Sequence, residues 1–353
     1  MKFGITFFPA VGPDDQSADK YFDDALDLAV YADERGFYHV KTVEHYFFPY
    51  GGYSPDPVPF LSAVAARTRS IRIATGAVIP AFSHPIQLAG RLAVLDNLSH
   101  GRLDVGFGRA FLPDEFAAFG IILDESRARF DDGVRIVERL WTEEDVVEDG
   151  PFHRFGPVTL LPRPYQRPGP PVFVATATSP ASAEQAGLHG RGLQAVPAIA
   201  GPEGFTEILA AYRRGWESGG RPSGTENVQV SLGAFVANDR DEAHKLGRLD
   251  EQLYSDKIAQ ATKSWATKRS TDYPGYENLA HVGALLHFDK RVRDDHILVG
   301  TVDDVRRQLA RLGESYGTDI TVSLTIHSGN LPAEVAERTL DYFADKIAPE
   351  FAD

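Results

Sequence analysis

The chain has 353 residues, of which 43% are hydrophobic, so it is long enough for one large α/β domain with a substantial core. Its formal net charge of -14 argues against nucleic acid and anionic membranes as partners, because either would require a basic face. The lack of cysteine excludes disulfides, thiolate catalysis and cysteine-bound metals.

The first residues run directly into a strand-like segment, without the cleavage region of a signal peptide. No apolar run in the sequence is long enough to span a bilayer. We therefore expect a cytoplasmic protein with no membrane partner.

Short apolar runs alternate with helical periodicity along the chain. After the first run, Phe22, Ala25, Leu26, Ala29 and Val30 recur at the spacing of one helix face. The predicted strands are residues 2–8, 39–44, 71–79, 103–108, 172–178, 193–198, 228–237 and 319–325. Each is followed by a helical pattern, and eight such units without a break in composition predict a single (β/α)8 TIM barrel over residues 1–353.

Two segments interrupt the repeat and are expected to be insertions. Residues 143–167 contain two glycines and four prolines, which is typical of a surface hairpin or ribbon. Residues 264–297 are rich in charge and show little periodicity. A connection of this length is usually either a lid over the site or a disordered loop, and both interpretations stay open at this point.

The ends of the predicted strands carry polar chemistry. In a parallel barrel these carboxyl ends open on one face, where active sites of this architecture lie. At Gly108-Arg109 a backbone without a side chain lies beside a guanidinium, which suits the close approach of a phosphate. Thr178, Ser179 and Ser182 lie at the start of the helix after the fifth strand. Their hydroxyls, the free backbone amides of the first turn and the helix dipole would all favour an anion there. Helix capping alone also explains these hydroxyls, but the nearby Arg109 favours an anion site.

Further short motifs follow one another along nearly the whole chain. In order, they are Glu44-His45-Tyr-Phe, Arg72-Ile-Ala-Thr-Gly-Ala-Val, Ser83-His-Pro85, Leu95-Asp-x-Leu-Ser-x-Gly-Arg-Leu103, Gly108-Arg109 with Glu115 and Phe119-Gly120, and Val299-Gly-Thr301 before a helix. In order and spacing the chain resembles the bacterial luciferase-like flavin monooxygenases. The resemblance implies a (β/α)8 barrel that binds reduced FMN (FMNH2) and uses O2 to oxygenate a substrate through a peroxyflavin.

The resemblance also implies where the FMN phosphate binds. It assigns the phosphate to Arg109, to the Ala177 and Thr178 amides and to the Thr178 hydroxyl, with Ser179 in the same turn.

Two further positions carry over from the family. Gly76 and Ala77 fall where the family has a non-prolyl cis peptide beneath the isoalloxazine ring, and small residues there let the ring lie against backbone. His45 falls on the family's active-site histidine, which implies a general base or a hydrogen-bond donor. An imidazole that titrates near neutrality suits either role.

The substrate and partners are less closely defined. Phe8, Phe47 and Phe111 lie on or next to the loops after the strands and are expected to form an apolar pocket for an aldehyde, aromatic or polyketide-like substrate. The run from Gly106 to Phe111 lacks the third glycine of a dinucleotide fingerprint, and no nicotinamide site is evident. A separate flavin reductase is therefore expected to supply FMNH2. The resemblance implies a homodimer that pairs through the second and third helices.

Three other functions remain as alternatives. A metal-dependent barrel hydrolase could use Glu44, His45 and His84, but the anion site at Arg109 would be unexplained, so we predict no metal. A deazaflavin-dependent oxidoreductase of the same superfamily shares the barrel and the phosphate site. A non-catalytic flavin-binding partner subunit is disfavoured because, by resemblance, such subunits lack the histidine and the lid that this chain retains at His45 and residues 264–297.

Overall fold

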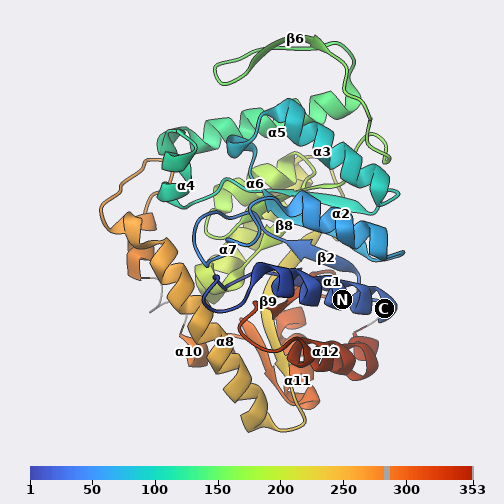
Figure 1. Ribbon diagram of the computed structural model, residues 1–353, viewed down its shortest axis with the longest axis vertical. Coiled ribbons are helices and arrows are strands. Elements are labelled where there is room, and N and C mark those ends of the chain that lie inside the picture. The colour runs from blue at the N-terminus through green and yellow to red at the C-terminus, as the bar shows by residue number, and fades with distance from the viewer. Residues whose placement is uncertain (282–286, 352–353) are drawn as a thin grey trace.

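The computed structural model describes residues 1–281 and 287–351, and within these residues eight parallel strands close into a barrel with helices outside it (Figure 1). In spatial order the barrel strands are β1 (Lys2–Phe7), β2 (His39–Thr42), β3 (Arg72–Val78), β4 (Leu103–Phe107), β7 (Val172–Thr176), β8 (Gly192–Ala195), β9 (Val228–Val236) and β11 (Thr321–His327). β9 pairs with β8 and β11, and β11 pairs with β1, which closes the ring. The predicted TIM barrel is confirmed.

Helices follow the barrel strands and cover their outer faces. They are α1 (Ala18–Glu34), α2 (Pro57–Arg67), α3 (Pro85–Leu98), α5 (Ser126–Thr142), α6 (Pro180–Leu188), α7 (Pro197–Ser218), α8 (Arg240–Ala261), α11 (Val302–Tyr316) and α12 (Ala333–Tyr342). Local sequence sets several of their starts. α2 and α3 each begin with proline, preceded by Asp56 and His84, whose side chains accept the backbone N–H two residues later.

A ninth parallel strand, β10 (Ile297–Gly300), was not predicted. It pairs with the C-terminal half of β9, from Gly233 to Val236, beyond the part of β9 that pairs with β8. The strand has only four residues and follows the short helix α10 (Phe288–Arg293). Four residues are too few to show a strand pattern next to the aperiodic segment before them.

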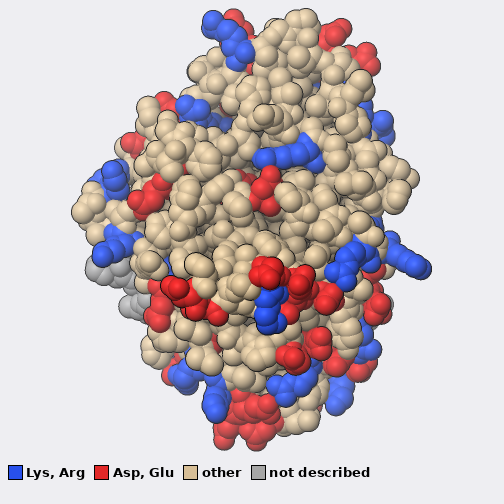
Figure 2. All heavy atoms as spheres, viewed as in Figure 1, with Lys and Arg blue, Asp and Glu red and all other residues tan. Residues whose placement is uncertain are grey.

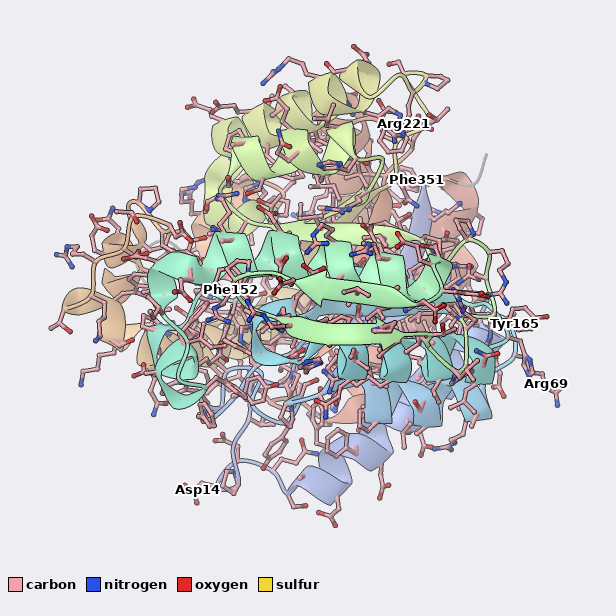
Figure 3. All side chains as sticks on the ribbon, turned by 90° about the horizontal axis from the view of Figure 1, so that it is seen from above. Asp14, Arg69, Phe152, Tyr165, Arg221 and Phe351 are labelled. Atoms are coloured by element: carbon pink, nitrogen blue, oxygen red, sulfur yellow. The ribbon has the colours of Figure 1, made fainter. Side chains whose placement is uncertain are left out.

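The segment between α5 and β7 contains an antiparallel hairpin of β5 (Val146–Asp149) and β6 (Arg154–Val158). The hairpin projects from the top of the barrel in Figure 1. Figure 3 looks down on it, with Phe152 labelled at its turn. The guanidinium of Arg129, on α5, lies 4.4 Å from the centre of the Phe152 ring and holds the turn near the helix.

The two ends of the chain lie side by side, and the Met1 amino group donates to the Phe351 carbonyl at 2.7 Å. On the face shown in Figure 2, acidic and basic side chains are interspersed rather than gathered in one basic patch. None of the helices in the described ranges has both the length and the apolar composition needed to cross a membrane.

The interior of the barrel is polar toward its centre, although barrels of this kind are usually filled by branched apolar side chains. Lys41 and His39, both on β2, hydrogen-bond to Ser323 on β11, and Gln194 on β8 hydrogen-bonds to Gln229 on β9. All five side chains are buried. This layer forms the floor beneath the cavity described next.

Candidate active site

A cavity of about 930 Å³ opens at the carboxyl ends of the barrel strands. Its lining includes all but one of the residues predicted from the sequence, namely Phe8, His45, Gly76, Ala77, Arg109, Phe111, Ala177, Thr178 and Ser179. The volume lies near the upper end of ligand sites, which span about 300–1,000 Å³. The cavity therefore has room for a large cofactor and a second small molecule.

Phe47 is the exception, and its predicted place in the substrate pocket is wrong. Its φ of 70° turns the chain at this point, and its side chain is 63% exposed. The ring packs near Tyr46 and Phe119 on the outside of the loop, so it does not line the cavity. Tyr50, three residues later, faces the cavity instead and is buried.

The floor of the cavity near β3 and β4 is made of backbone and small side chains. The Gly76–Ala77 peptide bond is cis, as the resemblance implies. A Cβ added to Gly108 would lie 3.1 Å from the Cβ of Ala77 and 3.9 Å from that of Ala175. Any larger side chain at Gly108 would fill this space, so the local sequence keeps a flat surface on which a planar ring can lie.

Hydroxyl groups and arginines lie near the start of α6. The Ser179 hydroxyl accepts the Ser182 N–H at 3.2 Å and caps the helix, and the Thr178 hydroxyl lies beside it. Arg109 and Arg127 face this helix start, and Arg127 Nη1 donates to the Ser182 hydroxyl at 3.4 Å. Neither arginine lies within ion-pair distance of a carboxylate in residues 1–281 and 287–351. Asp131 lines the same cavity and interacts electrostatically with both arginines, but it forms no ion pair with either. Two cations without an ion-pair partner near a helix N-terminus favour an anionic ligand.

Sequence reasoning missed Arg127. It lies in the first turn of α5, within an ordinary run of charged residues, and nothing in that run distinguishes it from the solvent-facing arginines nearby. Two other arginines of the cavity wall are neutralised, because Arg135 pairs with Asp132 and Glu148, and Arg191 pairs with Glu138. Only the fold reveals which of the arginines can bind a ligand.

His45 is held by a buried carboxylate that the sequence analysis did not place in the site. Its Nδ1 lies 3.1 Å from Glu115 Oε1, which also accepts the Tyr46 N–H at 2.9 Å. Glu115 is fully buried on α4 (Pro113–Ala118), and its Oε2 has no hydrogen-bond partner. With Nδ1–H donated to Glu115, Nε2 of His45 is the proton acceptor.

Aromatic rings surround His45. The ring centres of Tyr50, Phe8 and Phe111 lie 5.0, 5.8 and 5.8 Å from that of His45. Tyr254, on α8, packs against Phe8 at 5.4 Å and donates to the Tyr50 hydroxyl at 3.4 Å. The aromatic wall gives the histidine an apolar environment.

Glu44 has a structural position. It accepts the Tyr46 hydroxyl at 2.7 Å and the Ile79 N–H at 2.9 Å, which ties the loop after β2 to the end of β3. Burial raises the pKa of Glu44 to about 7 despite these two donors. His84 caps α3 instead of joining Glu44 and His45, so the ligand set of the hydrolase alternative is not assembled.

The chain after α8 covers one side of the cavity. Trp265 and Tyr273 are fully buried here and donate to the carbonyls of Phe111 and Ala110 at 2.9 and 2.8 Å. Asp272 contacts both arginines. Its carboxylate accepts the backbone N–H of Arg127 at 2.9 Å, and its carbonyl accepts from the Arg109 guanidinium at 3.3 and 3.4 Å. This cover, residues 263–281, overlaps the insertion expected at residues 264–297, of which residues 282–286 lie outside the described residues.

A family model described as luciferase-like monooxygenase matches residues 1–319. This chain belongs to the luciferase-like monooxygenase family. A crystal structure of a monooxygenase from Streptomyces bottropensis has 49% sequence identity and a TM-score of 0.90, with 100% of each chain covered.

Curated members of the family are more distant in sequence. The oxygenase component of the flavin-dependent trigonelline monooxygenase of Acinetobacter baylyi is 30% identical over 247 residues, which are 69% of this chain and 67% of that protein. The 4-hydroxyprotoasukamycin monooxygenase of Streptomyces nodosus subsp. asukaensis is 30% identical over 332 residues, 92% of this chain and 86% of that protein. The predicted family and enzyme class, a flavin-dependent monooxygenase, are confirmed by these matches.

A further relative is named as an F420-dependent enzyme. The F420-dependent glucose-6-phosphate dehydrogenase of Kribbella flavida is 34% identical over 227 residues, which are 62% of this chain and 66% of that protein.

Proposed function

We propose that this chain is the oxygenase of a two-component system, which takes reduced FMN from a separate flavin reductase and uses O2 to oxygenate a small apolar organic molecule. The observation that carries the proposal is that one cavity joins a cluster of arginines and hydroxyls, a stretch of backbone and small side chains at the ends of β3 and β4, and a histidine held by a carboxylate. The trigonelline relative, which is named as an oxygenase component, supports the separate reductase.

The residues of the cavity fit FMN. Arg109 and Arg127 would hold the phosphate together with the hydroxyls and free amides at the start of α6. The backbone of Gly76 and Ala77 and the bare Cα of Gly108 would lie against the ring. When bound, reduced FMN supplies the electrons with which O2 is activated.

The chain's own residues handle protons and water. Glu115 fixes the His45 imidazole so that its Nε2 can hold or move a proton in the cavity. The rings of Phe8, Tyr50 and Phe111, with the cover at residues 263–281, exclude water, which an oxygenation needs because solvent would divert reducing equivalents to hydrogen peroxide. The same apolar wall supports an aldehyde, aromatic or polyketide-like substrate.

The other candidate with specific support is an F420-dependent oxidoreductase, since a phosphate site suits either cofactor and the family contains such a relative. His45 with its buried Glu115 partner argues against a non-catalytic subunit. A homodimer through the second and third helices is supported by Val94 and Leu98 on α3, which are apolar and 41% and 50% exposed.

Titration of the purified protein with FMN, FMNH2 and F420 tests the cofactor, and product mass under 18O2 tests the reaction. The proposal expects tight binding of FMNH2 and a product heavier by one 18O atom, formed only when a reductase supplies FMNH2. Binding of F420 in preference to FMN, or turnover without incorporation of 18O, would overturn it.

A further inference from the structure

Lys41 is a buried cationic side chain without an anionic partner. It lies in the middle of β2, is only 2% exposed, and lines the cavity. Its Nζ donates to the Ser231 hydroxyl at 2.9 Å and to the Ser323 hydroxyl at 3.1 Å. Over the described ranges, no carboxylate lies within ion-pair distance of it. Buried lysines are almost always paired with an acid, so this arrangement needs a reason.

The neighbouring His39 and Arg72 do not supply the missing anion. His39 shares the Ser323 hydroxyl with Lys41, and Arg72 at the start of β3 is already bound by Asp104. Burial lowers the pKa of Lys41 to about 7, because the ammonium form is separated from water. The amine can therefore gain a proton at little cost when an anion approaches.

Lys41 lies against the backbone at the floor of the cavity. A Cβ added to Gly76 would lie 2.4 Å from Lys41 Cδ, so the lysine side chain runs directly against the bare backbone of Gly76. Thr6 on β1 is the register partner of Lys41, also lines the cavity, and has a buried hydroxyl without a hydrogen-bond partner. An unsatisfied hydroxyl beside an unpaired amine indicates a ligand with a negatively charged, hydrogen-bonding edge.

Reduced flavin is such a ligand. At neutral pH it loses the N1 proton, and the negative charge spreads over N1 and the neighbouring C2 carbonyl, whereas the oxidised ring is neutral. We propose that Lys41, with Thr6 beside it, is the counter-charge for the anionic ring of reduced FMN and makes the site selective for the reduced over the oxidised cofactor. The inference rests on the proposed function, and it assigns redox selectivity to a residue separate from the phosphate site and from His45.

The test compares affinities for FMN in two redox states. Anaerobic titrations with FMNH2 and aerobic titrations with FMN are made on the wild-type protein and on Lys41→Met, which keeps the length of the side chain and removes its charge. The wild type should bind FMNH2 at least about tenfold tighter than FMN, and Lys41→Met should lose most of this preference while its FMN affinity stays unchanged. A tenfold loss lowers the two-electron potential of the bound flavin by about 30 mV, which dye equilibration can measure.

Matched variants separate charge from other effects. Arg109→Ala should weaken both redox forms by the same factor, because the phosphate does not change on reduction. Thr6→Val should reduce the preference less than Lys41→Met, since a hydroxyl carries no charge. If Lys41→Met does not fold, Lys41→Gln retains a donor for the two serines and removes only the charge.

Each outcome decides the inference. A wild type that binds both redox forms equally, or a Lys41→Met or Lys41→Gln protein that keeps the full preference, overturns it while leaving FMN as the cofactor. A wild type that binds neither form of FMN overturns the proposed function, and this inference with it.

Discussion

The Arg109→Ala substitution tests the anion site most directly. Among the described residues, the Arg109 guanidinium donates to the Asp272 carbonyl at 3.3 and 3.4 Å and lies over the face of the Tyr273 ring. These long contacts are weak, so a phosphate can replace them at little cost. A charge-assisted hydrogen bond contributes about 1.5–3 kcal/mol. Losing it should weaken FMN binding by about 2–3 kcal/mol, or about 30- to 150-fold in Kd.

The assay is a flavin fluorescence titration of wild type and variant with FMN and with riboflavin, which lacks the phosphate. Riboflavin affinity should be the same for both proteins, so the four Kd values isolate the phosphate contact. Arg135→Ala is the matched control, because Arg135 lines the same cavity but is already bound by Asp132 and Glu148. An unchanged FMN affinity would refute the reasoning. An equal loss for riboflavin would also refute it, since the substitution would then act by loosening the cover at Asp272.

Three further perturbations have separate readouts. His45→Ala should leave FMN affinity nearly unchanged but lower the yield of product and raise hydrogen peroxide, and normal coupling in a peroxide assay would show that His45 is only structural. Trp265→Ala removes a fully buried anchor of the cover worth about 3–5 kcal/mol, so trypsin should cut faster after the exposed Lys268, and a cleavage rate equal to wild type would contradict this. The pKa of Asp304 is lowered chiefly by the hydrogen bond that its carboxylate accepts from Arg240, and also by the one that it accepts from Thr301 at the start of α11. Asp304→Asn should therefore lower the free energy of unfolding by about 1–2 kcal/mol at pH 7. This stabilisation is complete above the ordinary pKa of Asp, near 4, and is lost as the pH falls through the lower pKa of the folded state. The difference between the urea midpoints of the two proteins should therefore shrink toward about pH 3.5, and a constant difference would contradict this prediction.

The barrel could be predicted because its signal is local. Apolar runs and helical periods alternate within windows of a few residues, and parallel strands buried on both faces remain visible as apolar runs. The same locality explains the failure at β10, since four residues carry too little period to be distinguished from the end of a loop. A lysine in the middle of a predicted barrel strand, Lys41 in His39–Thr42, was a signal in the sequence that was not used.

The loop residues show the limit of this reasoning. Phe47 and Phe111 are alike in sequence terms, each an aromatic residue shortly after a strand. The positive φ of Phe47 sends its ring outward, whereas Phe111 turns inward to meet His45 and the cover. Which way a loop side chain points depends on backbone turns that are stabilised by distant contacts, so composition alone could not separate the two.

The amino-acid sequence was enough to predict the barrel and the strand-end residues at its mouth, because hydrophobic periodicity is local and all parallel strands end on one face. The family resemblance of the sequence added the expected roles of His45 and Arg109. The partners of these side chains became known only from the folded chain, because Glu115 reaches His45 from 70 residues away and Asp272 reaches Arg109 from 163 residues away. Such pairs depend on the paths of the loops in space, and a buried carboxylate or an unpaired cation can be recognised only when everything packed around it is known.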